Sequence, residues 1–405
     1  MNGDTVPRPR YAARIAPFAG MENAKVLTGI RRSGKSTLLR MIAEGMGPGK
    51  NVVMLDMDAF SNRRYLEAEE LYAKIKGSLA EGAENCLFID EVQDVRGWES
   101  VIRSLIAEKA CDIYLTGSNS RLLSGELATH LTGRANLIDV FTLTLSECIE
   151  FERRNGGSGD PEEALRKLLR FGGFPIVWGG CSESTAMVIV RDIVDAVVSR
   201  DIADRHGVRN TAVLGKILDY VCDNVGNPMS INNIYASLHS ADASIRRNAV
   251  YDYIGHLEEA CLIFRVEAYD VKGRMRLTSK YKYYLSDIGI KNARLSFRPE
   301  DVSGYMENII CLELRSRGYR VWIGDSGGRE IDFVGEMGGE KVYVQATSEL
   351  SSESVAEREF GSLRGIGDNF PKYVVTLKEG PLNHDADGIR CVTLAEFLTM
   401  ESYGR

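Results

Sequence analysis

The sequence has little of what would mark a membrane-spanning, secreted or zinc-binding protein. No apolar run approaches the roughly 20 residues that span a bilayer, and the N-terminal segment has no apolar stretch typical of a signal peptide. The eight cysteines are scattered and form no Cys-x-x-Cys pair, so we expect reduced thiols of a cytoplasmic protein and no zinc site. A net charge of −7 argues against a wholly basic nucleic-acid coat but leaves local basic patches open.

A glycine-rich segment near the N-terminus is the strongest motif in the chain. It fits the phosphate-loop pattern G-x-x-x-x-G-K-[ST] without a mismatch. An apolar stretch precedes it and a helix-like stretch follows, which is the strand–loop–helix context that the motif requires. We expect the loop to bind ATP, with Lys35 on the β/γ-phosphates and Ser36 on Mg²⁺. The nucleotide-binding residues predicted are Gly29, Ile30, Arg31, Arg32, Ser33, Gly34, Lys35, Ser36 and Thr37.

A second acidic motif makes this site competent for hydrolysis. Residues 86–89 are apolar and are followed by Asp90 and Glu91. This pattern indicates a buried parallel strand that delivers both acids to the carboxyl edge of a sheet, where such folds bind ligands. We expect Asp90 to hold Mg²⁺ and Glu91 to orient or deprotonate the attacking water. The alternative is a simple acidic end of a strand.

A third apolar run, from residue 113, ends in Gly117-Ser-Asn119-Ser, so Asn119, or else Ser118, is the candidate sensor of the γ-phosphate. The alternative is a plain turn. Arg134 follows a helix-like segment and precedes another strand-like run. A fixed guanidinium stabilises phosphoryl-transfer charge well, so Arg134 is a candidate arginine finger acting in a neighbouring subunit. A solvated surface arginine is the alternative.

These motifs resemble a largely uncharacterised bacterial and archaeal family of AAA+-type ATPases. In that family a C-terminal domain of unknown function resembles PD-(D/E)XK nucleases. The resemblance covers nearly the whole chain, and it implies AAA+ architecture and favours the finger role of Arg134. It is carried by Thr28-Gly-Ile-Arg-Arg-Ser-Gly-Lys-Ser-Thr, Phe88-Ile-Asp-Glu-Val-Gln-Asp, Leu115-Thr-Gly-Ser-Asn-Ser, Leu131-Thr-Gly-Arg and Phe171-Gly-Gly-Phe-Pro. We expect Gly172 and Gly173 of the last motif to form a tight turn.

The middle of the chain reads as a winged helix. Helical patterns cover residues 213–225, then a segment opened by Ser230 and another opened by Ser244, and two strand-like runs follow. Basic residues between 265 and 294 outnumber acidic ones, which favours contact with double-stranded DNA. The alternative is a winged helix used only for packing. The candidate DNA-binding residues are Arg246, Arg247, Lys272, Arg274 and Arg276.

The last module has the order helix, strand, strand with an acid, and strand, which is that of a PD-(D/E)XK core. Glu307 and Asp332 occupy its acidic positions. Where a working site carries Glu-x-Lys, this chain has Gln345-Ala-Thr347, which removes one carboxylate and the cation that help to activate water. We therefore expect Glu307, Asp332 and Gln345 to form a vestigial nuclease site; a weak or unusual nuclease is the alternative.

The sequence as a whole predicts a multi-domain α/β protein. We expect a P-loop AAA+ ATPase core with a parallel sheet (residues 1–142), a helical lid (143–208), a winged helix (209–297) and a PD-(D/E)XK-like domain (298–405). The leading function is ATP hydrolysis with Mg²⁺, coupled to a conformational or assembly change on DNA in a homo-oligomer, such as a hexameric ring. The alternatives are an ATP-regulated, Mg²⁺-dependent DNA nuclease and an ATP-switched signalling or scaffold protein.

Overall fold

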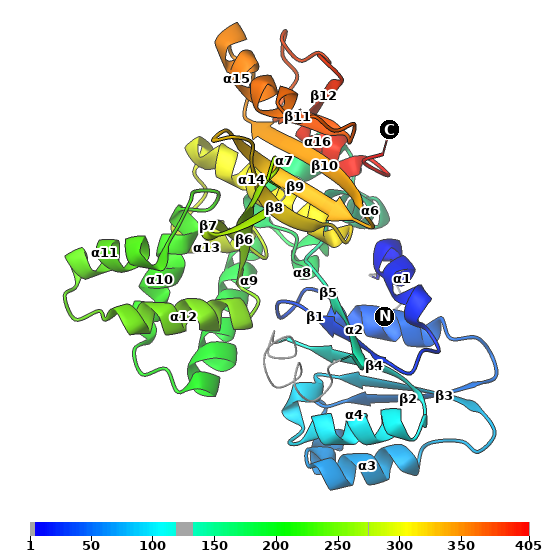
Figure 1. The fold of residues 1–405 in the computed structure, drawn as a ribbon. Helices are drawn as coiled ribbons and strands as arrows, with labels where there is room; N and C mark the ends of the chain where they lie inside the picture. The colour runs from blue at the N-terminus through cyan, green and yellow to red at the C-terminus, as the bar shows by residue number, and fades with distance from the viewer. Residues whose placement is uncertain (1–4, 119–132, 274, 405) are drawn as a thin grey trace. The chain divides into compact units, whose positions relative to one another are not determined.

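The computed structural model describes residues 5–118, 133–273 and 275–404, and at residues 276 and 278–280 the backbone alone. Its contacts divide the chain into two compact units (Figure 1). The first comprises Met1–Phe141 with Glu259–Cys261, and the second comprises Thr142–Glu258 and Leu262–Arg405. None of the helices in the described ranges is long and apolar enough to cross a membrane.

The first unit is built on a five-stranded sheet in which every pairing is parallel. The strand order is β2-β3-β4-β1-β5, so β4 lies between β1 and β3. This confirms the predicted α/β core with a parallel sheet, and the apolar stretch that precedes the phosphate loop forms β1. The strands are β1 (Ala24–Thr28), β2 (Lys50–Asp56), β3 (Glu84–Asp90), β4 (Asp112–Gly117) and β5 (Ala135–Asp139). The helices are α1 (Pro9–Ile15), α2 (Lys35–Glu44), α3 (Ala68–Lys76) and α4 (Trp98–Ala107), with short turns η1 (Ala16–Phe18), η2 (Phe60–Tyr65) and η3 (Val92–Asp94).

Helices cover both faces of this sheet (Figure 1). Successive strand residues point to opposite faces. Leu87 and Ile89 of β3 accordingly join a core with apolar residues of α3 and α4, whereas Phe88 joins a second core with residues of α1 and α2. Coverage on both faces explains why residues 86–89 are uninterruptedly apolar, as expected of a strand in a parallel sheet.

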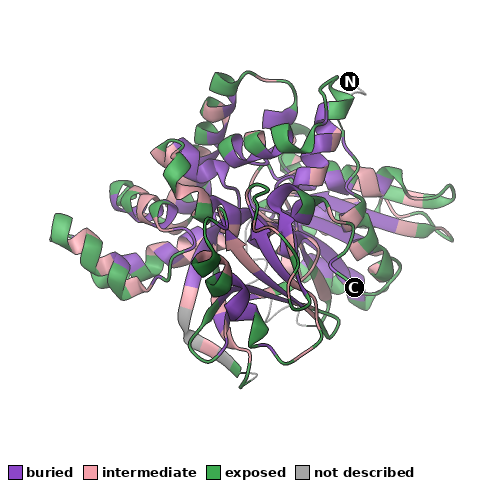
Figure 2. Ribbon diagram, turned by 90° about the horizontal axis from the view of Figure 1, so that it is seen from above, coloured by how far each residue is buried: buried purple, intermediate pink, exposed green. Residues whose placement is uncertain are grey.

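The second unit contains a seven-stranded mixed sheet in the order β12-β11-β10-β9-β8-β6-β7. Buried residues, purple in Figure 2, concentrate along the strands and the inner sides of the helices. The strands are β6 (Ile263–Asp270), β7 (Met275–Leu285), β8 (Arg320–Asp325), β9 (Glu330–Met337), β10 (Glu340–Thr347), β11 (Lys372–Thr376) and β12 (Ile389–Thr393). The helices are α6 (Leu145–Arg154), α7 (Pro161–Phe171), α8 (Pro175–Trp178), α9 (Glu183–Ala196), η5 (Val197–Asp204), α10 (Thr211–Asp223), α11 (Ile231–Ala241), α12 (Arg247–Glu259), α13 (Gly289–Leu295), η6 (Pro299–Asp301), α14 (Val302–Ser316), α15 (Glu353–Arg364) and α16 (Leu394–Thr399).

The segment predicted as a winged helix has the expected element order of three helices and a hairpin. Ser230 caps α11 by accepting a hydrogen bond from the Asn233 amide at 3.1 Å, as its position predicts. The expected helix start at Ser244 was wrong, because the Ser244 amide and hydroxyl both donate to the Asp242 carboxylate and form a turn. The helix α12 begins at Arg247 instead.

The hairpin β6–β7 is not a free-standing wing. Its strand β6 pairs in parallel with β8, through Ala268 opposite Ile323 and the next two residues. The hairpin therefore forms one edge of the sheet whose other strands come from residues 320–393. This pairing places side chains of β7 in the same sheet as the predicted nuclease-like residues.

A buried carboxylate explains the Gly172-Gly173 pair. One oxygen of Asp287 accepts the Gly173 amide at 2.7 Å and the other accepts the Gly289 amide at 2.8 Å. Burial raises the pKa of Asp287 to about 6, while these donors favour its ionised form. Gly172 has φ 77° and ψ −174°, which is a conformation for glycine alone, and a Cβ there would overlap the Asp287 carboxylate.

We expect Gly172→Ala to lower the free energy of unfolding by more than about 2 kcal/mol, since it adds backbone strain and an overlap with Asp287. Unfolding in urea, followed by circular dichroism, measures the change. Gly180→Ala is the matched control, because Gly180 also has positive φ (91°) but has no atom within 4 Å of its added Cβ. Gly180→Ala should lower the free energy of unfolding by about 1 kcal/mol. Equal costs for the two variants would contradict the packing explanation.

Candidate functional site

The predicted phosphate loop lies at the carboxyl end of β1 and leads directly into α2. Gly34 caps α2 in a left-handed conformation (φ 96°). Gly29 has φ 144°, and a Cβ on it would strike the Val140 carbonyl. Glycine is therefore required at both positions. The curled backbone and the start of α2 give the amide-lined, dipole-assisted site that binds phosphate.

Lys35 is held against the loop that it is predicted to serve. Its side chain is 3% exposed, and its Nζ donates to the carbonyls of Gly29 and Ile30, both at 3.0 Å. Burial lowers the pKa of Lys35, while the carboxylates of Glu91 and Asp90 oppose that shift. A phosphate oxygen is a stronger, charge-assisted partner for this ammonium than a neutral carbonyl.

Arg8 supports the loop from outside the motif. Its guanidinium is buried and donates to the Ser33 carbonyl at 3.1 Å and to the Phe141 carbonyl at 3.0 Å. It thus ties the middle of the phosphate loop to the chain that follows β5. The sequence alone does not indicate this contact, because it joins residues 133 positions apart.

The acids at the end of β3 meet the loop as predicted. Asp90 is 5% exposed and lies near the Ser36 hydroxyl. Burial raises the pKa of Asp90, and the hydroxyls of Thr116 and Ser36 oppose that shift. Glu91 adopts a left-handed conformation (φ 53°, ψ 49°) directly after the strand. Its carboxylate accepts a hydrogen bond from the side-chain Nε2 of Gln93 at 2.5 Å.

The pair Ser36 and Asp90 fits a Mg²⁺ ion. Mg²⁺ prefers hard oxygen ligands and is bound with few protein groups beside nucleotide phosphates. A hydroxyl and a carboxylate that lie near each other beside a phosphate-binding loop supply that donor set. Ser36 and Asp90 would hold the ion, which would neutralise charge on the phosphates.

The remaining predicted residues of this site have different outcomes. Asn119 lies outside the described residues. Its alternative, Ser118, is 1% exposed, and its hydroxyl has no hydrogen-bond partner within the described ranges. The carbonyl of Arg134 accepts the Ala24 amide at 2.9 Å, which places Arg134 at the start of β1. A strand of five residues, about 16 Å long, separates it from its own phosphate loop, so Arg134 cannot complete the site of its own subunit.

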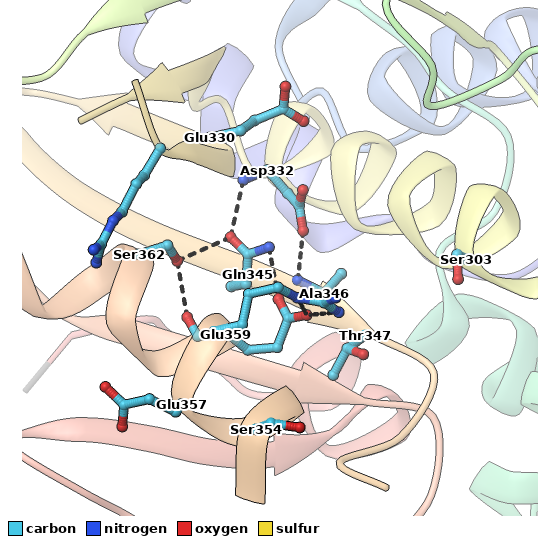
Figure 3. A pocket seen from close by; sticks show the side chains of 12 residues that line it. Ser303, Glu330, Asp332, Gln345, Ala346, Thr347, Ser354, Glu357, Glu359 and Ser362 are labelled. Atoms are coloured by element: carbon cyan, nitrogen blue, oxygen red, sulfur yellow. Dashed lines mark hydrogen bonds and ion pairs between the residues drawn. The ribbon is translucent and has the colours of Figure 1, made fainter. Parts of the chain in front are cut away.

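In the second unit, Asp332 and Gln345 of the predicted vestigial nuclease site line a cavity of about 780 Å³ (Figure 3), whereas Glu307 pairs with Lys282 of β7. Figure 3 shows Gln345 between Asp332 and Glu359. The Gln345 Oε1 accepts the Asp332 amide at 3.4 Å, and its Nε2 donates to Glu359 at 3.0 Å. The Ala346 amide donates to the Asp332 carboxylate at 2.7 Å. Burial and the neighbouring Glu307 raise the pKa of Asp332 well above its usual range.

Two further charged groups, a lysine and a carboxylate, lie close to these residues. Lys282 of β7 is 3% exposed, and its Nζ lies 3.2 Å from Glu307 and 2.7 Å from Glu330. Burial alone would lower the pKa of Lys282, but the carboxylates of Glu307, Asp332 and Glu330 raise it. Glu359 of α15 provides the further carboxylate. No motif spacing could find them, since Lys282 arrives through the β6–β8 pairing and Glu359 through packing of α15.

Three of the five basic residues predicted to contact DNA can be located on the surface. Arg246, Arg247 and Lys272 are exposed. Arg274 lies outside the described residues, and of Arg276 only the backbone is described. Three other cations of the basic stretch are unavailable to a partner. Lys282 is buried as above, Lys291 is 2% exposed beside Asp301 at 2.9 Å, and Arg294 forms a two-bond pair with Asp219.

The parallel five-stranded sheet, the phosphate loop and the acid pair at one edge define a P-loop domain of the AAA+ fold. Residues 21–149 match a family model described as an AAA domain, and residues 162–301 match one described as a domain of unknown function, DUF8612. An uncharacterized protein from Haemophilus influenzae is 30% identical over 403 residues, covering 98% of this chain and 100% of the relative. The chain belongs to the same family of AAA-domain proteins as this relative.

A second relative is an uncharacterized protein, MJ1544, from Methanocaldococcus jannaschii. It is 29% identical over 348 residues, which is 83% of this chain and 76% of the relative. Among solved structures, the Aeropyrum pernix ORC1 protein in complex with DNA is similar with 13% identity and a TM-score of 0.29, covering 72% of this chain and 93% of that one. A STAND protein, PH0952, from Pyrococcus horikoshii is 13% identical with a TM-score of 0.30. The match covers 90% of this chain and 48% of that one. TM-scores this low carry no argument about function.

Proposed function

We propose that this chain is an ATPase that hydrolyses ATP with Mg²⁺ in its first unit and couples the cycle to a conformational or assembly change on double-stranded DNA. The observation that carries the ATPase assignment is that Asp90, at the end of β3, lies near Ser36 of a complete phosphate loop. Phosphoryl transfer depends mostly on positioning and on charge stabilisation, and both kinds of group are gathered at this edge.

The positions of the described residues of the site support a role for each of them. Lys35 exchanges the loop carbonyls for phosphate oxygens when ATP enters. Asp90 and Ser36 would hold the Mg²⁺ ion. Glu91 orients the attacking water and accepts its proton, once its carboxylate is released from Gln93. We assign the γ-phosphate sensor to Asn119, as the sequence predicts.

Glu91→Gln should retain ATP binding and lower kcat at least about 100-fold, because it removes the base but not the phosphate contacts. Lys35→Ala should weaken ATP binding itself. Phosphate release and binding of a fluorescent ATP analogue separate the two effects. Glu81→Gln, an exposed acid before β3, is the matched control and should hydrolyse ATP like the unaltered chain. Full turnover in Glu91→Gln would exclude the assigned role.

The placement of Arg134 supports action in a neighbouring subunit of a homo-oligomer, since it lies at the opposite edge of its own sheet. Mixing Arg134→Ala with Glu91→Gln chains tests this. Each variant is inactive alone if both residues are needed. Mixed assemblies then contain sites with an intact Glu91 and a neighbour's intact Arg134, so turnover returns in part. No recovery at any mixing ratio would argue against a finger acting between subunits.

The DNA partner is supported by exposed cations in the predicted winged helix. Arg246 and Arg247 lie at the N-terminal end of α12, where recognition helices contact DNA, and Lys272 lies in the β6–β7 turn. These three residues remain open to solvent while Lys282, Lys291 and Arg294 pair with acids of their own chain. The DNA-facing surface is therefore smaller than the sequence suggests.

Replacing both Arg246 and Arg247 with alanine should weaken binding to a DNA duplex and lower the slope of log K against log salt by about 2, since each phosphate contact releases roughly one counterion. Fluorescence anisotropy across a salt series measures the slope. Arg166→Ala, an exposed arginine on α7, is the control. Binding that does not depend on salt in any of these proteins would favour the signalling or scaffold alternative.

A Mg²⁺-dependent DNA nuclease is the second candidate, and the position of Lys282 favours it. A buried cation, Lys282, pairs with Glu307 and Glu330, and a further carboxylate, Glu359, lines the cavity despite the loss of Glu-x-Lys. Glu307, Asp332 and Glu330 supply more carboxylates than Lys282 alone pairs with, and their crowding raises the pKa of Asp332. A divalent ion held by Asp332 and Glu307 would favour their ionised forms. Arg329 and Arg358 line the same cavity and suit a phosphodiester.

A supercoiled plasmid incubated with Mg²⁺ or Mn²⁺ tests this candidate. We expect nicking by the unaltered chain and at least about 100-fold less nicking by Asp332→Asn, because the metal shell loses a carboxylate. ATP hydrolysis should be unchanged in that variant. Glu357→Gln, a 70% exposed acid on α15 at the cavity rim, is the control. Absence of nicking with either metal, or equal nicking by Asp332→Asn, would remove the nuclease candidate.

A further inference from the structure

Thr116 contacts both acids of the ATP site, although the sequence alone assigns it no role there. It lies on β4, is 0% exposed, and faces Leu27 of β1 in the strand register. Its Oγ1 accepts the Glu91 amide at 2.9 Å and also forms a short hydrogen bond with Asp90 Oδ1. One buried hydroxyl thus joins the backbone of one acid to the side chain of the other.

The donors and acceptors present fix the direction of these two hydrogen bonds. A hydroxyl has one proton and two lone pairs. The Glu91 amide is a donor, so it takes a lone pair of the Thr116 oxygen. The hydroxyl proton is then left for Asp90 Oδ1, and a carboxylate there is the acceptor that it suits. Threonine is also stiff about its first side-chain bond, so the strand fixes where the hydroxyl points.

The Glu91 backbone gives this contact a function beyond packing. Adjacent residues of a strand point to opposite faces, which would separate the two carboxylates. The left-handed conformation of Glu91 ends that alternation immediately after Asp90. For a residue with a side chain this conformation costs roughly 1–2 kcal/mol. The hydrogen bond that the Glu91 amide donates to Thr116 helps to hold it, together with the one that the Glu91 carbonyl accepts from the Asp94 amide.

We propose that Thr116 is a positioning residue for ATP hydrolysis, which sets the orientation of Asp90 for the metal and of Glu91 for water through its single hydroxyl. This inference rests on the proposed ATPase function. Thr116 makes no contact with Lys35 or with the glycines of the loop among its described hydrogen bonds. Its loss should therefore impair turnover and the use of metal, but not the capture of the phosphates.

Thr116→Val removes the hydroxyl and keeps the shape of the side chain. We expect kcat to fall about 10–100-fold, as for other groups that orient metal ligands, and the Mg²⁺ concentration at half-maximal rate to rise. KM for ATP at saturating Mg²⁺ should change less than about threefold, and so should the affinity for an ATP analogue in EDTA. Thr116→Ser restores the hydroxyl and should restore kcat to within about threefold. Tyr114→Phe is the control and should match the unaltered chain. It removes a hydroxyl from the same strand that, among the described residues, hydrogen-bonds to Asp112 and not to the acids of the ATP site.

The outcomes separate this inference from the ATPase assignment. If the unaltered chain does not hydrolyse ATP, the proposed function fails. If it does, and Thr116→Val keeps its kcat and its Mg²⁺ requirement, the positioning role alone is overturned. The role is also overturned if Thr116→Ser is as impaired as Thr116→Val, since the hydroxyl is then not the active feature. Loss of analogue binding in EDTA by Thr116→Val would overturn it as well, because that is a structural effect.

Discussion

The parallel pairing of β4 between β1 and β3 is the constraint on which the ATP site depends. Parallel strands end at the same edge, so the loop after β1 and the acids after β3 meet there. The loop alone is a phosphate cradle, and the acids alone are the end of a strand. The intervening strand fixes the distance between them and contributes Thr116, whose hydroxyl bonds to both acids.

Buried charge has a similar organising role in the second unit. Lys282 is acceptable in the sheet interior because Glu307 and Glu330 pair with it, and isolated buried charges are otherwise very costly. Those acids come from elements after residue 300, whereas Lys282 comes from the hairpin predicted to be a wing. Asp287 likewise depends on the amides of Gly173 and Gly289. Such contacts bind segments far apart in the chain into one unit.

Local signals were enough to predict much of this protein. The phosphate loop, the strand that ends in Asp90-Glu91, the cap at Ser230 and the order of elements in the C-terminal segment all depend on neighbouring residues. Where the local signal was ambiguous the prediction failed, as at Ser244, whose hydroxyl was free to bond either to a helix start or to Asp242. The count of basic residues overstated the number of cations open to a partner, because a composition does not show which side chains are buried or paired.

By itself the sequence determined the class of the first unit, since a phosphate loop is a local backbone requirement written in glycines, a lysine and a serine. Only the tertiary structure decided which distant groups complete each site. Arg8 reaches the loop across 133 positions, Thr116 reaches Asp90 across 26, and Gln345 meets Glu359 across 14. Strand register and helix packing determine these contacts, and neither can be read from the residues that form the contacts. It also decided that Arg134 lies a full strand away from its own phosphate loop.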